Sequence, residues 1–239
     1  MADGETAKSS DLPTRAISAL AMIGVAGAAL WFGGWAWTAF VTFIAAGVLW
    51  EWRALVAGAI VSPRMRGLWN AAGIVYVLPA AAVLVILREQ DPRLFGVIFP
   101  LAAVIGTDVG AYFAGRAFGG PKIAPRISPS KTWSGLVGGI VCASLTLAAA
   151  IKLGDPKIPM GELLKLGAVF GGAAAIVAQA GDFFESWMKR RAGVKDSGRI
   201  IPGHGGLFDR ADGLIAVLFV IAIAMAGAMI PYASPILAR

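Results

Sequence analysis

The stretch WSGLVGGIVCASLTLAAAI, residues 133–151, contains no Asp, Glu, Lys or Arg. Its length approaches the ~20 apolar residues that a helix needs to cross a bilayer. The apolar stretch that begins at residue 35 ends near residue 50, or alternatively near Ile60, beyond Glu51 and Arg53. Continuous apolar runs differ from the alternating pattern of a transmembrane β-barrel. We expect membrane-spanning helices at residues 16–32, 35–50, 68–87, 94–114, 133–151, 163–181 and 213–231.

The composition agrees with this interpretation. Hydrophobic residues make up 58% of the chain, charged residues make up 15%, and the mean hydropathy is +0.74. Soluble domains carry about 25% charged residues. We therefore predict an all-α fold, a polytopic integral membrane protein with about seven transmembrane helices and an active site on the cytoplasmic face.

The basic residues indicate an orientation. The chain has 21 Lys and Arg against 14 Asp and Glu, and most of the basic residues fall in the inside loops if the N-terminus is cytoplasmic. We attribute the net charge of +7 to orientation and anionic head groups, with no nucleic-acid partner. We expect a polar tail at 1–15, unlike a secretory signal, N-terminal transmembrane helices at 16–105, and a catalytic membrane domain at 106–239 with a signature loop at 182–212.

That loop gathers chemically active side chains. Glycines and Pro202 flank its histidine, which suggests backbone close to a ligand. Carboxylates at the ends of apolar spans are costly unless they are paired or bound to metal, and oxygen ligands suit Mg²⁺. The alternative is a solvated loop of mixed charge. The residues concerned are Asp182, Glu185, Asp196, His204, Asp209 and Asp212.

A second polar cluster lies in residues 106–135. Asp108 falls in or at the edge of a span, where the alternative role is polar helix packing. Ser128, Lys131 and Thr132 stand just before the fifth span, where a hydroxyl can cap the helix and a phosphate can bind its N-terminus. Both clusters are cytoplasmic in the predicted topology, so they can meet.

Several common motifs are absent from the sequence. There is no GxxxxGK[ST], HExxH or GxSxG, and one histidine with one cysteine does not build a usual zinc site. The CDP-alcohol phosphotransferase pattern is also missing. Carboxylates and basic residues clustered at a membrane face favour metal-assisted chemistry on phosphates.

The segment from Ser186 to Asp212 closely resembles the signature of phosphatidate cytidylyltransferases, also called CDP-diacylglycerol synthases. Residues 106–135 resemble further elements of that family but depart at Ser130, where lysine is usual, and at Ser134, where glutamate is usual. The resemblance covers residues 106–213. The matching positions of the signature are Ser186, Lys189, Arg190, Lys195, Asp196, Gly198, Pro202, Gly203, His204, Gly205, Gly206, Asp209, Arg210 and Asp212.

This resemblance implies that CTP and phosphatidic acid react to give CDP-diacylglycerol and pyrophosphate. It also implies a homodimer in the bacterial inner membrane and Mg²⁺, alone or with a second cation, held by Asp182 and Asp209. His204 is expected to hydrogen-bond a phosphate or the nucleotide, and the alternative for it is a structural role. The expected catalytic residues are Asp182, Asp209, Lys195, Asp196, His204, Arg210 and Asp212. The expected substrate-binding residues are Ser128, Lys131, Thr132, Lys189, Arg190 and Asp108.

Two other functions compete with this one. A CTP-dependent polyprenol or isoprenoid-alcohol kinase would share the membrane and the nucleotide, but it would transfer the γ-phosphate to an alcohol. A transporter or channel would carry charged or broken helices at mid-membrane. The long match from Ser186 to Asp212 favours the cytidylyltransferase over both.

Overall fold

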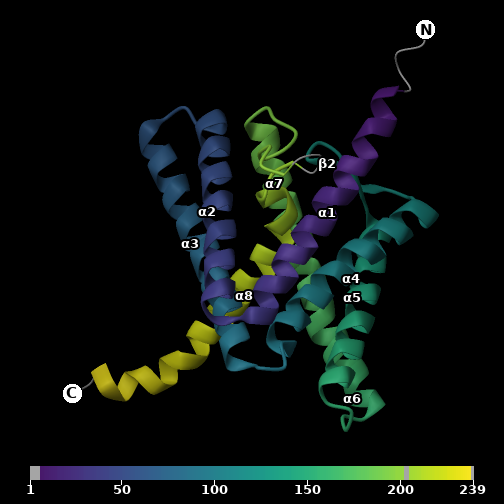
Figure 1. Cartoon of the computed structure of the whole chain (residues 1–239), viewed down its shortest axis with the longest axis vertical. Coiled ribbons are helices and arrows are strands. Elements are labelled where there is room, and N and C mark those ends of the chain that lie inside the picture. The colour runs from purple at the N-terminus through teal and green to yellow at the C-terminus, as the bar shows by residue number, and fades with distance from the viewer. Residues whose placement is uncertain (1–5, 202–204, 238–239) are drawn as a thin grey trace. The chain divides into compact units, whose positions relative to one another are not determined.

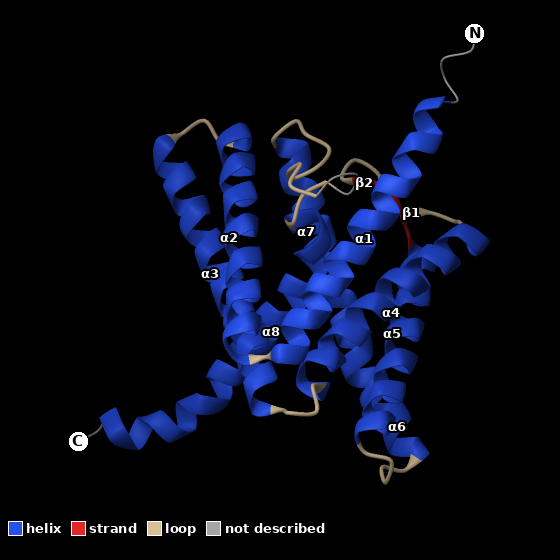
Figure 2. Cartoon of the chain, in the orientation of Figure 1, coloured by secondary structure: helices blue, strands red, loops and turns tan. Residues whose placement is uncertain are grey.

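The computed structural model describes residues 6–201 and 205–237, with side chains for residues 16–201 and 205–228. This part of the chain is almost entirely helical (Figure 2), which confirms the all-α class. A π-helical turn, Gly167–Gly171, interrupts the sixth apolar stretch. The helices, labelled in Figure 1, are α1 (Thr6–Phe32), α2 (Gly34–Ala59), α3 (Pro63–Gln90), α4 (Phe95–Phe118), α5 (Trp133–Gly154), α6 (Met160–Leu166), α7 (Gly172–Arg191) and α8 (Phe208–Leu237).

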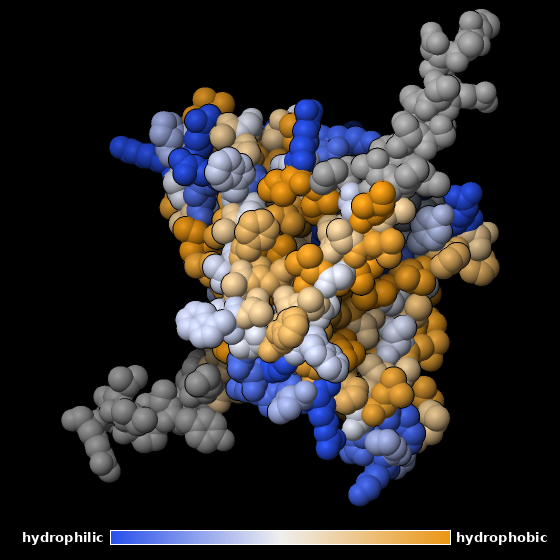
Figure 3. Space-filling view, viewed as in Figure 1, coloured by the Kyte–Doolittle hydropathy of each residue, from blue (hydrophilic) through white to orange (hydrophobic). Residues whose placement is uncertain are grey.

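Six helical segments of the described residues are long and apolar enough to cross a membrane, close to the seven predicted. The seventh candidate, Ala16–Phe32, is shorter, and α1 begins upstream of it, within the predicted polar tail. The six segments are Gly34–Ala59, Pro63–Gln90, Phe95–Phe118, Trp133–Gly154, Met160–Arg191 and Phe208–Ala228. Hydrophobic side chains cover much of the length of the helices in Figure 3, as lipid contact requires.

Two helices extend further than expected. Helix α2 continues to Ala59, the alternative end considered above, and so includes Glu51. Helix α7 continues to Arg191, so Asp182 and Glu185 lie on a helix and not in the predicted loop at 182–212. The connection between α7 and α8 is therefore confined to residues 192–207.

A glycine sets the end of α7. Gly193 has a φ of 71°, a left-handed conformation that glycine adopts without steric cost. The N–H of Gly193 donates to the carbonyl of Arg190 at 3.2 Å, and the N–H of Val194 donates to the carbonyl of Lys189 at 3.0 Å. These two bonds are the Schellman arrangement that closes many helices.

A short hairpin precedes α5, and the sequence did not predict it. Strand β1 (Lys122–Ala124) pairs antiparallel with β2 (Ser128–Thr132). A two-stranded hairpin leaves unpaired edges, so it tolerates Pro129. Thr132 ends β2 and caps α5, because its hydroxyl accepts the N–H of Gly135 at 3.1 Å. The fifth span thus starts where the sequence predicted.

The chain divides into two compact units. The first unit comprises the residues up to Ile74 together with Met188–Ala211. The second unit comprises Val75–Trp187 and the residues from Asp212 onward.

Within the second unit, glycines let α4 and α5 pack closely. A Cβ at Gly110 would overlap the carbonyl oxygen of Gly138, and a Cβ at Gly138 would overlap Ala114. The opposite face of α5 stays exposed, with Val137 59%, Val141 53% and Leu145 56% accessible at a spacing of four residues. Small residues therefore face the neighbouring helix, and large apolar residues face outward, as in lipid-exposed helices.

Replacing Gly110 by alanine should destabilise the protein. The added methyl group meets the backbone of α5, and overpacking of this kind costs roughly 1–3 kcal/mol. We expect a lower Tm in detergent for Gly110→Ala. Gly24→Ala is the matched control, because no atom lies within 4 Å of its Cβ position. Equal Tm values for the two variants would contradict the close packing of α4 and α5.

Candidate functional site

Three carboxylates converge in the second unit. Asp182 and Glu185 stand one turn apart on α7, and Asp212 lies near the start of α8. One ligand atom from each lies within 4.8 Å of the others. Glu185 is fully buried, whereas Asp182 and Asp212 are partly exposed. We call these three residues the acidic cluster.

Glycines bring the two helices of the acidic cluster together. A Cβ at Gly181 would lie 2.6 Å from the Cβ of Ala216 and 2.8 Å from the carbonyl oxygen of Asp212. A Cβ at Gly213 would lie 3.4 Å from Ala178. The Gly213 distance is an ordinary van der Waals contact, but Gly181 has no room for a side chain. Glycine at position 181 therefore permits the approach that places Asp182 beside Asp212.

The acidic cluster fits a hard divalent cation. Carboxylate oxygens are the ligands that Mg²⁺ prefers, and it usually takes one or two of them together with waters or phosphate oxygens. Three carboxylates this close repel one another unless a positive charge lies among them. The cluster therefore includes the predicted ligand Asp182 and adds Glu185 and Asp212. Asp209, the other predicted ligand, belongs to the first unit.

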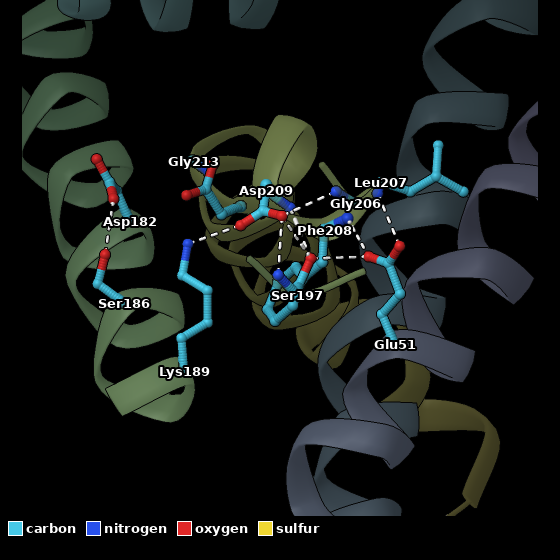
Figure 4. Close-up of polar contacts among 11 residues, drawn as sticks. Glu51, Asp182, Ser186, Lys189, Ser197, Gly206, Leu207, Phe208, Asp209 and Gly213 are labelled. Carbon is cyan, nitrogen blue, oxygen red and sulfur yellow. Dashed lines mark hydrogen bonds and ion pairs between the residues drawn. The ribbon is translucent and has the colours of Figure 1, made fainter. Parts of the chain in front are cut away.

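Lys131 supplies one positive charge to the cluster. Its ammonium pairs with Oδ2 of Asp182. Oδ1 of Asp182 accepts the hydroxyl of Ser186 at 3.3 Å (Figure 4). The side chains of Lys131 and Asp182 are 23% and 28% exposed, so solutes can reach both. Lys131 and Asp182 also interact electrostatically with Asp108 of α4. One residue from each polar cluster expected from the sequence, Lys131 and Asp182, thus meets the other inside the second unit, whereas Asp196 and Asp209 belong to the first unit.

In the first unit, Asp209 is the centre of a separate hydrogen-bond network (Figure 4). Its Oδ1 pairs with Nζ of Lys189 at 2.6 Å. Its Oδ2 accepts the backbone N–H groups of Ser197 and Gly206 and the hydroxyl of Ser197, each at 2.9 Å. Asp209 therefore connects Ser197 and Gly206 of the segment before α8 to the first turn of that helix.

Glu51 of α2 joins this network and was not predicted from the sequence. Its side chain is only 2% exposed. Its Oε1 accepts the N–H of Leu207 at 3.0 Å, and its Oε2 accepts the N–H of Phe208 at 2.8 Å and the hydroxyl of Ser197 at 2.9 Å. The available signal was a single acidic residue within an apolar helix, which is costly unless it has partners.

The other predicted site residues fall into three groups. Ser128 and Thr132 are buried in the hairpin, and Thr132 caps α5. The charged side chains of Arg190, Lys195, Asp196 and Arg210 are exposed. His204 lies outside the described residues.

Comparison with known proteins identifies the family of the chain. The model of the Cytidylyltransferase family matches residues 61–227, which include the acidic cluster and Asp209. A phosphatidate cytidylyltransferase of Brucella suis biovar 1 is 43% identical over 196 residues, covering 77% of this chain and 69% of that protein. Proteins of the same name from Pseudomonas aeruginosa and Haemophilus influenzae are 37% identical over 178 residues and 33% identical over 182 residues. These alignments cover 72% and 70% of this chain and 64% and 63% of the two relatives. The chain therefore belongs to the cytidylyltransferase family.

Proposed function

We propose that the protein is a Mg²⁺-dependent phosphatidate cytidylyltransferase, which converts CTP and phosphatidic acid to CDP-diacylglycerol and pyrophosphate. The observation that carries the proposal is the acidic cluster with Lys131 paired to Asp182, in a membrane-spanning chain of the cytidylyltransferase family. The names of the relatives supply the substrate class.

The reaction needs little acid–base catalysis. The lipid phosphate is a monoester that carries about 1.5 to 2 negative charges at pH 7, by analogy with phosphoserine. One of its oxygens attacks the α-phosphorus of CTP, the bond from that phosphorus to the bridging oxygen breaks, and pyrophosphate leaves with the electron pair. The site must therefore offset the repulsion between two anions and stabilise the leaving group.

The acidic cluster is where a cation would be held. Mg²⁺ bound by Asp182, Glu185 and Asp212 would neutralise negative charge on the triphosphate. Asp209 is the other ligand that the family resemblance implies. It would bind the same cation as Asp182 or a second cation.

Each unit contains a lysine whose ammonium is held by a carboxylate, Lys189 in the first unit and Lys131 in the second. Lys131 pairs with Asp182, and Lys189 pairs with Asp209. Both are partly accessible, so phosphate oxygens can compete with the carboxylates for these ammonium groups. The exposed Arg190, Lys195 and Arg210 add positive charge that attracts the nucleotide.

We place the enzyme in the bacterial inner membrane as a homodimer, with its N-terminus and active site cytoplasmic. The distribution of Lys and Arg and the intracellular supply of CTP support this orientation. In a Cys142→Ser background, Val194→Cys should resist membrane-impermeant thiol reagents in intact cells and react after permeabilisation. Labelling in intact cells would overturn the orientation.

The lipid product tests the proposed function directly. Purified protein in detergent should incorporate label from [α-³²P]CTP into a CDP-lipid when Mg²⁺ and phosphatidic acid are present. Label from [γ-³²P]CTP should appear in pyrophosphate. Transfer of the γ label to a polyprenol, with CDP released, would identify the alcohol kinase instead and contradict the proposal.

Lys131 should be needed for turnover. We expect Lys131→Gln to lower kcat/KM by at least about tenfold, the effect of losing a modest charge-assisted contact of ~1.4 kcal/mol. Lys131→Arg should restore only part of the activity, because a planar guanidinium differs in shape from an ammonium.

Lys122→Gln serves as the control for this substitution. Lys122 lies in the same hairpin and is exposed, and its ammonium donates to the carbonyl of Ser130 at 3.4 Å. Steady-state kinetics for both substrates should leave Lys122→Gln close to wild type. Wild-type kcat/KM in Lys131→Gln would make Lys131 an interfacial anchor with no part in phosphate binding.

A further inference from the structure

Glu51 lies before the residues that the family model matches, and no substrate-binding role is expected for its helix. Its carboxylate is nevertheless among the most buried polar groups of the described residues, in the interior of α2. A carboxylate removed from water costs several kcal/mol unless donors surround it. Glu51 therefore depends on the three groups that donate to it.

Two of these donors belong to the N-terminus of α8. The first N–H groups of a helix have no partner inside the helix, and the positive end of the helix dipole favours an anion there. A local Ser, Thr, Asp or Asn usually supplies the cap. Here Glu51 accepts the N–H groups of Leu207 and Phe208 from 156 and 157 positions away in the sequence. The start of α8 is thus fixed to α2.

The third donor connects Glu51 to Asp209. The hydroxyl oxygen of Ser197 lies 2.9 Å from Oε2 of Glu51 and 2.9 Å from Oδ2 of Asp209. A hydroxyl has one proton, so it donates to one of the two carboxylates at a time. Ser197 also accepts the N–H of Asp209 at 3.3 Å. A displacement of Glu51 therefore changes the hydrogen bonds made by Asp209.

Two glycines of the connecting segment, residues 192–207 between α7 and α8, lie against the Glu51 carboxylate. A Cβ at Gly198 would lie 2.6 Å from Cδ of Glu51, and a Cβ at Gly206 would lie 2.5 Å from its Oε2. Only glycine leaves the required space at these two positions. Gly198 and Gly206 thus allow the backbone at these two positions to lie against the carboxylate of Glu51.

We propose that Glu51 is a positioning residue for cytidylyl transfer, which holds Asp209 in its working orientation through Ser197 and the first turn of α8. The inference rests on the proposed function for its catalytic consequence only. Glu51 is only 2% exposed, so its removal should affect the reaction through the placement of Asp209 and of the residues that bond to both carboxylates.

The test compares Glu51→Gln with Glu89→Gln. Glutamine has the size of glutamate, but its NH₂ group presents a donor where Glu51 accepts one. Glu89 is exposed near the end of α3. Its replacement by glutamine makes the same carboxylate-to-amide change away from Ser197, Leu207 and Phe208. We expect kcat for Glu51→Gln to fall by at least about tenfold, while KM for CTP and for phosphatidic acid changes by less than about threefold. Glu89→Gln should match wild type.

Ser197→Ala provides a second test that does not depend on the folding of Glu51→Gln. Ser197→Ala removes the hydroxyl link and leaves the buried α2 intact. It should lower kcat in the same way, and the double variant should lose no more than the stronger single variant, because both act through one connection. Full additivity, or wild-type kcat in either single variant, would overturn the inference.

Amide hydrogen exchange supplies a readout without activity. Peptides that include Ser197, Gly206 and Phe208 should exchange faster in Glu51→Gln than in wild type and in Glu89→Gln. Unchanged exchange would overturn the inference whatever the kinetics show. A wild-type protein that forms no CDP-lipid would contradict the proposed function, and exchange would then decide the inference alone.

Discussion

A carboxylate in an apolar helical protein must receive hydrogen-bond donors or a cation, and this requirement organises the polar part of the molecule. In the first unit, Glu51 and Asp209 receive backbone N–H groups, the hydroxyl of Ser197 and the ammonium of Lys189. In the second unit, the acidic cluster receives Lys131 at Asp182. An anion without such partners would cost more than the marginal stability of a typical protein can offset.

The glycines follow from the same requirement. Gly198 and Gly206 leave room for the carboxylate of Glu51, and Gly181 lets α7 approach α8 closely enough to place Asp182 beside Asp212. At each of these positions a neighbouring group lies where a side chain larger than glycine would extend. Gly198 and Gly206 of the signature therefore act by leaving space for a carboxylate. Gly193 and Gly205 act differently, because each has a positive φ that glycine adopts without steric cost.

Apolar runs predict most of the fold, because a bilayer demands about 20 apolar residues per span. Thr132 was predictable as a cap, since Pro129 and the hydroxyl cluster indicate a helix start. The hairpin before α5 was not predictable, because strands of three and five residues leave no clear period in the sequence. The extension of α7 through Arg191 was obscured by its charges, although Gly193 and the basic last turn were available signals.

The same contrast holds for the candidate site. Asp182, Lys131 and Asp212 were predicted from their positions, and the structure groups them within one unit. Glu51 was not predicted, because its partners lie more than 140 residues away and a single sequence contains no record of such pairs. Long-range hydrogen bonds to backbone N–H groups leave no motif, since any residue type except proline can supply the donor.

Under the proposed function, Asp182, Glu185 and Asp212 hold the divalent cation used in cytidylyl transfer. The Mn²⁺ affinity of the purified protein, measured from the electron paramagnetic resonance of free Mn²⁺, tests this assignment. Asp212→Asn should weaken binding by at least about tenfold, or ~1.4 kcal/mol, while Glu162→Gln at the exposed start of α6 should leave it unchanged. Equal Mn²⁺ affinity in Asp212→Asn and wild type would contradict the claim.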